Sequence, residues 1–378
     1  MKIAKGLMPF LLFIFMSVTL LTGCSHVDKT DVEAVITNEL DLLKNLDSAT
    51  TQKYVSYKEL FPDTTQEIEL SKEVKEVFSL FFQDFDYKIL DVNVDKDKQS
   101  AQANLRLVTL DAHALAEDFS KAQLKHEISQ SASSEEATEQ TISLEERYTL
   151  LNELLKSNDY QTVERNCTIS LDASDKDGET SWEIRRTNTL ENDLVGGLMN
   201  NLTDPDILSP EDTILVYLNT LKNMSTEELG NYLNADSIIS TEDPAKISLA
   251  EALVKQVHST FDYSIGETTV SGYTATVTAN ITTFDSDAIL ENYQKELDSY
   301  LASVDAVIDG AQKRYEKSYS LLLEYIEENT ATKTVETTFT LINDGASWKL
   351  EDAGTVFGQA LFGTLSSSPV EDKQETNG

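Results

Sequence analysis

The stretch Phe85-Asp86-Tyr87-Lys88-Ile89 recurs as Phe261-Asp262-Tyr263-Ser264-Ile265, an offset of 261 − 85 = 176 residues. The match continues at this offset without a gap, through Val94/Val270, Ala103-Asn104/Ala279-Asn280 and Asp111-Ala112/Asp287-Ala288. One unbroken register across so many positions indicates an internal duplication. A period of this length predicts tandem domains, because solenoid repeats run to roughly 20–50 residues.

The start and the end of the two units also correspond. Upstream, six positions match at an offset of 178: Ile36/Ile214, Leu40/Leu218, Leu43/Leu221, Lys44/Lys222, Asn45/Asn223 and Leu46/Met224. Downstream, Asp177-Gly178 before Ser181-Trp182 matches Asp344-Gly345 before Ser347-Trp348. Turn formers gather over residues 200–209, where Ser209-Pro210 supplies an N-cap with proline at the first helical position. We therefore predict a first domain over residues 30–203 and a second over residues 204–365.

Each unit is predicted to open with two helices. Thr30-Asp31-Val32-Glu33 forms a capping box, and apolar residues follow it at three- and four-residue spacing as far as Leu46. The second helix carries an apolar stripe of Val74, Val77, Phe78 and Phe81. Its counterpart in the second unit is predicted to begin at another capping box, Ser248-Leu249-Ala250-Glu251. One apolar stripe on a helix predicts packing against a flat surface.

Two β-hairpins with a helical insertion between them complete each unit. The predicted strands are residues 86–94, 101–110, 161–171 and 181–187 in the first unit, with 273–279, 334–342 and 347–351 among those of the second. Asp344-Gly345 is favoured in tight hairpin turns. In the second unit, apolar stripes on either side of Gly310 predict a helical hairpin, and in the first unit a loop over residues 129–139 interrupts the same insertion. The predicted fold class is α+β, a tandem repeat.

Two leading helices across a curved antiparallel sheet, with an Asp-Gly…Ser-Trp hairpin near the end, resemble the nuclear transport factor two-like and cystatin-like domains of Gram-positive lipoproteins. The resemblance implies a curved sheet that usually encloses a cone-shaped pocket. The long helical insertions depart from the simplest members of these families. Such folds host enzymes, binders and scaffolds alike, so the resemblance implies no particular activity.

The N-terminus has the pattern of an export signal. Lys2 and Lys5 precede an apolar run over residues 7–21, which at about 15 residues is shorter than the roughly 20 that a membrane-spanning helix needs. Leu21-Thr22-Gly23-Cys24 resembles the lipobox of bacterial prolipoproteins in all four positions. The resemblance implies a diacylglyceryl group on the Cys24 thiol and cleavage before Cys24. The alternatives are a plain signal peptide with an incidental cysteine, or an uncleaved N-terminal helix.

This motif predicts the cellular location of the protein. Residues 1–23 would be the signal peptide, residues 24–29 a tether, and lipid on Cys24 would hold the chain at the outer face of the cell membrane. The polar residues 366–378 have no apolar periodicity and are predicted to be a disordered tail. The net charge is −36, and removal of Lys2 and Lys5 makes it 28 − 66 = −38. Such an excess of carboxylates repels phosphate backbones, so we expect no nucleic-acid partner.

Residues with catalytic or ligand-binding chemistry are sparse. With Cys24 lipidated, Cys167 is the only other cysteine, so the mature chain can form no intramolecular disulfide. Cys167 lies on an alternating, mostly apolar strand face, where we expect a small buried hydrophobe. The histidines His26, His113, His126 and His258 have no partner at a metal-ligand spacing.

Two further motifs contain some of the residues of a functional site. If Gly178 took the sixth position of a calcium loop, Ala173 and Ile184 would take the first and twelfth positions, where the metal needs carboxylates. Asp86-Tyr87 and Asp262-Tyr263 place an acid beside a phenol, a pair capable of acid–base work. Its presence in both units favours a structural role. We therefore predict no catalytic, cofactor-binding or metal-binding residue and no cofactor.

The functional expectation is a membrane-anchored, non-catalytic binding or scaffolding module. Its partner would be another envelope protein, a peptide or a small ligand, in addition to the membrane lipid held through Cys24. The acidic insertion helices, being additions to the fold, are the expected contact surface. The alternative is a small-molecule receptor or an enzyme that uses a pocket on the concave face of the sheet, so the sequence leaves the question of an enzyme open.

Overall fold

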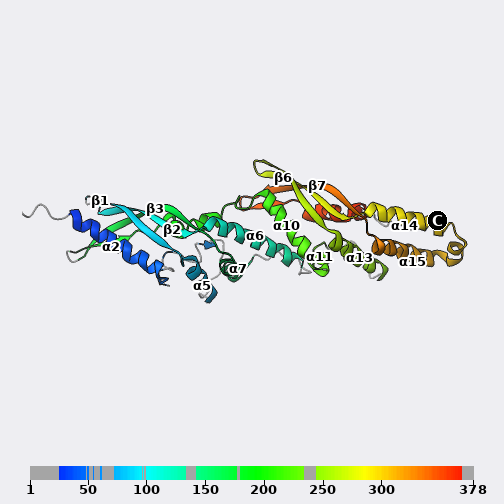
Figure 1. Ribbon diagram of the computed structural model, residues 1–378, viewed down its shortest axis with the longest axis horizontal. Coiled ribbons are helices and arrows are strands. Elements are labelled where there is room, and N and C mark those ends of the chain that lie inside the picture. Colours follow the sequence, from blue (N-terminus) through cyan, green and yellow to red (C-terminus); the bar gives the residue numbers. More distant parts are fainter. Residues whose placement is uncertain are drawn as a thin grey trace, which may run out of the picture. The chain divides into compact units, whose positions relative to one another are not determined.

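The computed structural model describes residues 25–47, 49–50, 54, 60–61, 72–95, 97, 99–132, 142–176, 179–233 and 244–367. The contacts within the chain separate two compact units. Unit 1 comprises the described residues up to Ala116 together with Leu144–Leu202, and unit 2 comprises those of Glu117–Ser143 together with the described chain from Thr203 on. Each unit contains one four-stranded antiparallel sheet with helices, which confirms the α+β class (Figure 1).

The sheet of unit 1 is a meander whose strands follow chain order: β1 (Asp86–Asp95), β2 (Ser100–Leu110), β3 (Thr162–Lys176) and β4 (Glu179–Ile184). Side chains of β2 alternate between buried and exposed, as expected of a strand with one face on the core. Helix α2 (Ser25–Lys44) buries its apolar stripe, Val32, Ile36, Leu40 and Leu43, almost completely. The remaining helices of this part of the chain are α5 (Lys72–Phe81), α6 (Ala112–Ser131), α7 (Leu144–Ser157), α8 (Asn188–Leu194) and α9 (Leu198–Leu202).

Unit 2 repeats this plan. Its strands, again in chain order, are β5 (Asp262–Ser271), β6 (Thr274–Phe284), β7 (Thr332–Asn343) and β8 (Trp348–Leu350). Its helices are α10 (Pro210–Asn223), α11 (Thr226–Tyr232), α13 (Pro244–Thr260), α14 (Ser286–Leu301), α15 (Val304–Glu328) and α16 (Ala353–Phe362), followed by the 3₁₀ turn η1 (Gly363–Ser367). Ser209 caps α10 by accepting from the backbone N–H of Asp212, as the sequence predicts.

Two predicted helix starts are wrong. Helix α2 begins at Ser25 and not at Thr30, so residues 25–29, predicted as a tether, are helical. No proline or glycine interrupts residues 25–29, so the helix can extend over them. Helix α13 begins at Pro244, four residues before the predicted Ser248, because proline is tolerated in the first turn of a helix.

The gapless match between the units is also wrong beyond the first strand of the first hairpin. Ile89 pairs with Leu105, and its counterpart Ile265 pairs with Ala279, so β1/β5 keep the offset of 176 while β2/β6 have 279 − 105 = 174. The reason is the turn, because Asp95 and Ser100 are separated by four residues but Ser271 and Thr274 by only two, Gly272 and Tyr273. The offset changes by two residues, an even number. Equivalent side chains of the two sheets therefore keep the same buried or exposed face.

Some predicted features lie outside the described residues. These are the signal segment, Cys24, the loop predicted over residues 129–139 from residue 133 on, the turn Asp177-Gly178 and the tail from residue 368. Residues 117–132, which the sequence assigns to the first repeat, group with unit 2. The predicted first domain, residues 30–203, includes these residues, whereas their contacts place them in unit 2.

Candidate functional site

The interior of unit 1 leaves almost no space for a ligand at the cavity beneath its helices. This cavity has a volume of about 10 Å³ and is lined entirely by apolar side chains, among them Leu60, Val77, Phe78, Phe81, Leu115 and Leu151. Such a volume is at the lower limit for a single water molecule. In unit 2 the inward side chains of β6 are buried, and Val277, Ala279 and Ile281 among them are at most 1% exposed. The faces that would line a concave pocket are therefore packed with side chains.

A shallow hollow opens on the sheet of unit 1 instead, with a volume of about 390 Å³. Its lining includes Asn93, Gln102, Ser170 and Arg185. The guanidinium of Arg185 is already paired, because its Nε, at 2.9 Å, and its Nη2 both donate to the carboxylate of Asp172. Ligand pockets are typically enclosed and mostly apolar, and this hollow is polar and open.

The repeated acid–phenol pair connects a helix to a strand. Tyr87 OH donates to Asp41 Oδ1 of α2 at 2.8 Å, and Tyr263 OH donates to Asn219 Oδ1 of α10 at 2.5 Å. Burial and the hydrogen bond to Asp41 raise the pKa of Tyr87 to about 12, whereas the ion pair with Lys44 lowers the pKa of Asp86. Neither group titrates near neutral pH, where a general acid or base works best.

The remaining residues singled out in the sequence do not come together. His113 and His258 are exposed, and His126 Nε2 lies 2.9 Å from Nε2 of Gln130 on the same helix. The side chain of His26 lies outside the described residues. Cys167 is buried, and its burial together with the nearby carboxylate of Asp193 raises the pKa of the thiol to about 12. Within the described residues, no group of three or more His, Cys, Asp and Glu side chains is placed to hold a metal ion.

Helices α14 and α15 of unit 2 form a two-helix arm, whose base contributes Ile289, Tyr319 and Ile326 to the core of the unit (Figure 1). The two helices lie side by side and are connected by a hydrogen bond between Tyr293 Oη and Ser318 Oγ at 2.7 Å. At its base, Gln256 of α13 donates to the carbonyls of Ile326, at 2.7 Å, and Asn329, at 3.1 Å. The base is thus anchored in unit 2, while no residue of α14 beyond Ile289 is buried.

The end of the arm does not have the predicted single break at Gly310. Helix α14 already ends at Leu301, and Ser303 caps the next helix by accepting from the N–H of Ala306. A short helical segment then runs to Gly310, whose φ of 71° and ψ of 179° reorient the chain. Tyr300 OH donates to Asp309 Oδ2 at 2.9 Å and holds this end together. Glycine is the residue that adopts a positive φ without steric cost.

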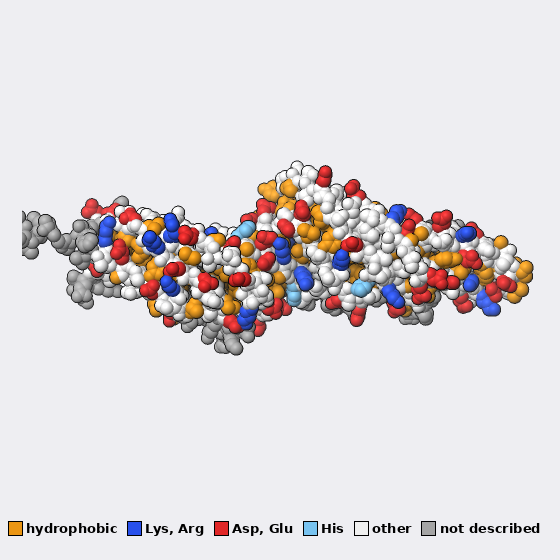
Figure 2. Space-filling model, viewed as in Figure 1, with side chains coloured by type: hydrophobic (Ala, Val, Ile, Leu, Met, Phe, Trp, Pro, Cys, Tyr) orange, Lys and Arg blue, Asp and Glu red, His pale blue; other side chains and the backbone are white. Residues whose placement is uncertain are grey.

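Four apolar side chains of this segment face outward, and we call them the arm tip: Leu301, Val304, Val307 and Ile308. Leu301 is 49% exposed, and the other three are 74–79% exposed. Figure 2 shows hydrophobic side chains at the end of the arm.

Among the residues that the structure describes, no helix is long and apolar enough to cross a membrane.

Comparisons with known proteins add little to this geometry. No protein-family model matches the chain, and no curated protein matches it significantly. Among solved structures, the chain is similar to YcdA from Bacillus subtilis, a protein provisionally described as a lipoprotein. The similarity has a TM-score of 0.25 and 12% identity, and it covers 73% of this chain and 96% of YcdA. At this TM-score the likeness supports no inference about fold or function.

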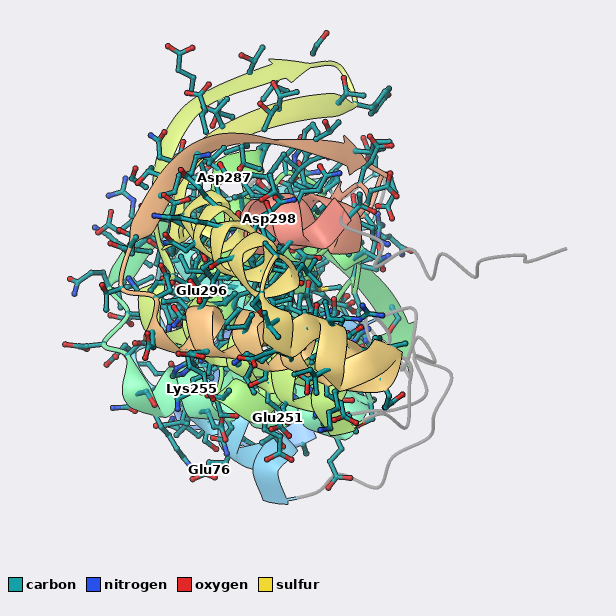
Figure 3. The ribbon with its side chains drawn as sticks, turned by 90° about the vertical axis from the view of Figure 1, so that its right-hand side faces the viewer. Glu76, Glu251, Lys255, Asp287, Glu296 and Asp298 are labelled. Atoms are coloured by element: carbon teal, nitrogen blue, oxygen red, sulfur yellow. The ribbon has the colours of Figure 1, made fainter. Side chains whose placement is uncertain are left out.

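Charged groups surround the arm tip. Glu296 and Asp298 lie along α14, where Figure 3 labels them, and over residues 296–314 four acidic side chains exceed two basic ones, a net charge of −2. In the sequence Val304 and Ile308 lie on an apolar stripe, which predicts that they pack within a helical hairpin. The structure exposes them instead. Ser303 preceding a Val-rich segment is the local signal that indicates an earlier helix end.

Proposed function

We propose that this chain is a lipid-anchored extracytoplasmic binding module without catalytic activity, and that the arm of unit 2 carries its contact surface. The lipobox at residues 21–24 supports the anchor. The inward sheet faces are filled with side chains, and the cavity beneath the helices of unit 1 has a volume of only about 10 Å³, which favours a binding surface over an internal site. The arm ends in exposed apolar side chains.

The observation that carries the proposal is the exposure of the arm tip. Burial of Val304, Val307 and Ile308 against a partner would be favourable, by roughly 25 cal/mol per Å² of apolar surface removed from water. A cluster of such side chains on a projecting element, rimmed by polar groups, is typical of protein–protein contact sites. The acidic flank favours a partner with an apolar groove and basic groups beside it, because complementary charge guides the encounter.

Photocrosslinking in whole cells tests this surface. A photoreactive residue at Val307 should trap a defined partner protein, whereas the same residue at Val270, an exposed valine on β5, should not. Val307→Asp combined with a photoreactive residue at Ile308 should reduce the yield, because a carboxylate opposes burial in an apolar groove. Equal trapping from Val270 and Val307 would refute the arm as the contact surface.

The anchor is tested separately by metabolic labelling with an alkyne-bearing fatty acid. The wild-type chain should incorporate label, and Cys24→Ala should not. Cys167 serves as the internal control, because Cys167→Ala should leave the labelling unchanged. Unchanged labelling of Cys24→Ala would exclude the lipid anchor.

The alternative function, a small-molecule receptor, rests on the hollow beside Arg185. It is examined by a ligand screen with thermal denaturation as the readout. A ligand that raises the melting temperature of the wild-type protein but not that of Arg185→Ala would favour the receptor. In the absence of such a ligand, the binding module remains the better account.

A further inference from the structure

Helix α14 loses its packing partners soon after it begins. It starts in the same way as its counterpart α6, because Asp285 and Asp111 cap the two helices and the next turn of each is buried, at Ile289 and Leu115. Further along, α6 contributes Ile128 to the core of unit 2, whereas α14 has no buried residue beyond Ile289. The outer part of α14 therefore has only α15 beside it.

The two helices cover each other only thinly in the outer half of the arm. Between Ile289 and Tyr319, Ala306 is the only buried residue, and every residue of 311–317 is exposed. Tyr315 in this stretch is 37% exposed. A helix in water is stabilised mainly by the packing of its apolar face, so this half of the arm leaves apolar surface open to a further element.

The charges of this outer half are sorted along the chain. Residues 296–309 contain four acidic side chains and no basic one, whereas residues 311–317 contain three basic side chains and one acidic one. Across these two segments, which the structure describes in full, the one ion pair is the 3.7 Å contact between Lys313 and Asp309. The other acidic and basic groups are therefore free to pair with a partner.

The acidic and the basic segment lie at the same level of the arm. Tyr293 is hydrogen-bonded to Ser318, and Tyr300 to Asp309, so α14 and α15 run antiparallel and residues 296–298 lie opposite residues 311–315. Such a surface is self-complementary. A two-fold axis across the arm would bring the acidic segment of one copy to the basic segment of another, and the exposed apolar side chains of both to the same place.

We propose that two copies of this chain associate through their arms, which lie antiparallel so that residues 296–309 of each pack on residues 311–317 of the other. This inference rests on the proposed function and names a second copy as the partner of the arm. The partner needs apolar surface with basic groups beside it, and Tyr315 with Arg314 and Lys317 meets this need. The contact is isologous, so it closes at two copies, and the four helices bury the arm tips between them as in a helical bundle.

Charge reversal in two differently tagged full-length copies tests this contact. With a photoreactive residue at Val307, wild-type copies should give a crosslinked dimer that carries both tags. Arg314→Glu with Lys317→Glu makes the basic segment acidic, and Glu296→Lys with Asp298→Lys reverses acidic groups of the other segment. When both tags are on the same variant, the dimer should fall by roughly tenfold or more, because like charges then face each other.

The two variants together should restore the dimer, because each supplies the charges that the other lacks. Lys88→Glu with Lys255→Glu is the matched control, since it changes the net charge as much as the reversal of the basic segment, at exposed positions outside the arm. This control should give as much dimer as the wild type. All of these substitutions alter exposed side chains, so the thermal midpoints should agree with that of the control.

The outcomes separate this inference from the proposed function. If Val307 traps a different protein and no crosslink joins the two tags, the arm is a contact surface, but its partner is not a second copy and this inference fails. If the tags are joined but the mixed variants do not restore the dimer, the charged segments do not face each other, which overturns the inference as well. If Val307 traps nothing, both proposals fail.

Discussion

Lys44 Nζ lies 2.7 Å from Asp86 Oδ1, and the second unit repeats this ion pair between Lys222 and Asp262 at the same 2.7 Å. In each unit the lysine lies in the last turn of the helix, α2 or α10, and the aspartate begins the first strand of the sheet. The tyrosine beside the aspartate donates to Asp41 in one unit and to Asn219 in the other. The acceptor is a carboxylate in one unit and an amide oxygen in the other. The hydrogen bond from the tyrosine therefore requires an oxygen acceptor but not a negative charge.

Asp262→Asn should therefore lower the thermal midpoint slightly, because it removes an exposed ion pair between α10 and β5. The loss should shrink as salt is raised towards 1 M, where screening acts over about 3 Å. Tyr263→Phe is the matched control, since the loss of a hydrogen bond between neutral groups should not depend on salt. Melting curves at low and high salt measure both. A salt-independent loss for Asp262→Asn would contradict the ion pair.

Thr283→Val should destabilise unit 2. Thr283 is buried, and its Oγ1 donates to the carbonyl of Leu361 at 3.1 Å, so valine would leave that carbonyl without its donor at a cost of about 1–2 kcal/mol. Thr109 occupies the equivalent position of unit 1, and its Oγ1 has no hydrogen-bond partner among the residues that the structure describes. Thr109→Val should be neutral or stabilising. Urea denaturation of the two variants decides whether the hydrogen bond matters.

The β7–β8 turn should contribute stability that depends on pH. The ion pair with Lys349 and the N–H groups of Ala346 and Ser347 lower the pKa of Asp344 to about 2. Because the folded-state pKa is below the unfolded value, the stabilisation is complete above about pH 4 and is lost as the pH falls towards 2. Asp344→Asn should be less stable than wild type at pH 6, and the difference should vanish near pH 2. A difference in melting temperature that stays constant over this range would refute the prediction.

Cys167 should resist thiol reagents in the folded protein. Its thiol is buried in unit 1 with a pKa of about 12, so hardly any thiolate is present at pH 8. Mass spectrometry after treatment with iodoacetamide should show modification of Cys167 only when denaturant unfolds the chain. Asp193→Asn offers a control, since removing the neighbouring charge should not accelerate the reaction while the thiol stays buried. Rapid modification of the native protein would contradict the buried position.

The secondary structure was largely predictable because it rests on local periodicity. The alternation of β2 and the stripe of α2 are visible in the sequence, and both elements form with that face buried. The sequence does not predict the helix starts at Ser25 and Pro244, because several residues near each helix end can serve as a cap. The two-residue shift between β2 and β6 was missed because the sequence match does not show how many residues each turn contains.

The arm tip was only partly predictable. A stripe such as Val304 and Ile308 shows that a helix has an apolar side, but it does not say what that side packs against. The anchor motif, the acidic charge, the duplication and the order of helices and strands are determined by the sequence alone, since each depends on neighbouring residues or on composition. Only the tertiary structure decides that α6 completes the core of unit 2 while its counterpart α14 leads to an exposed tip, because burial depends on surfaces brought together from distant parts of the chain.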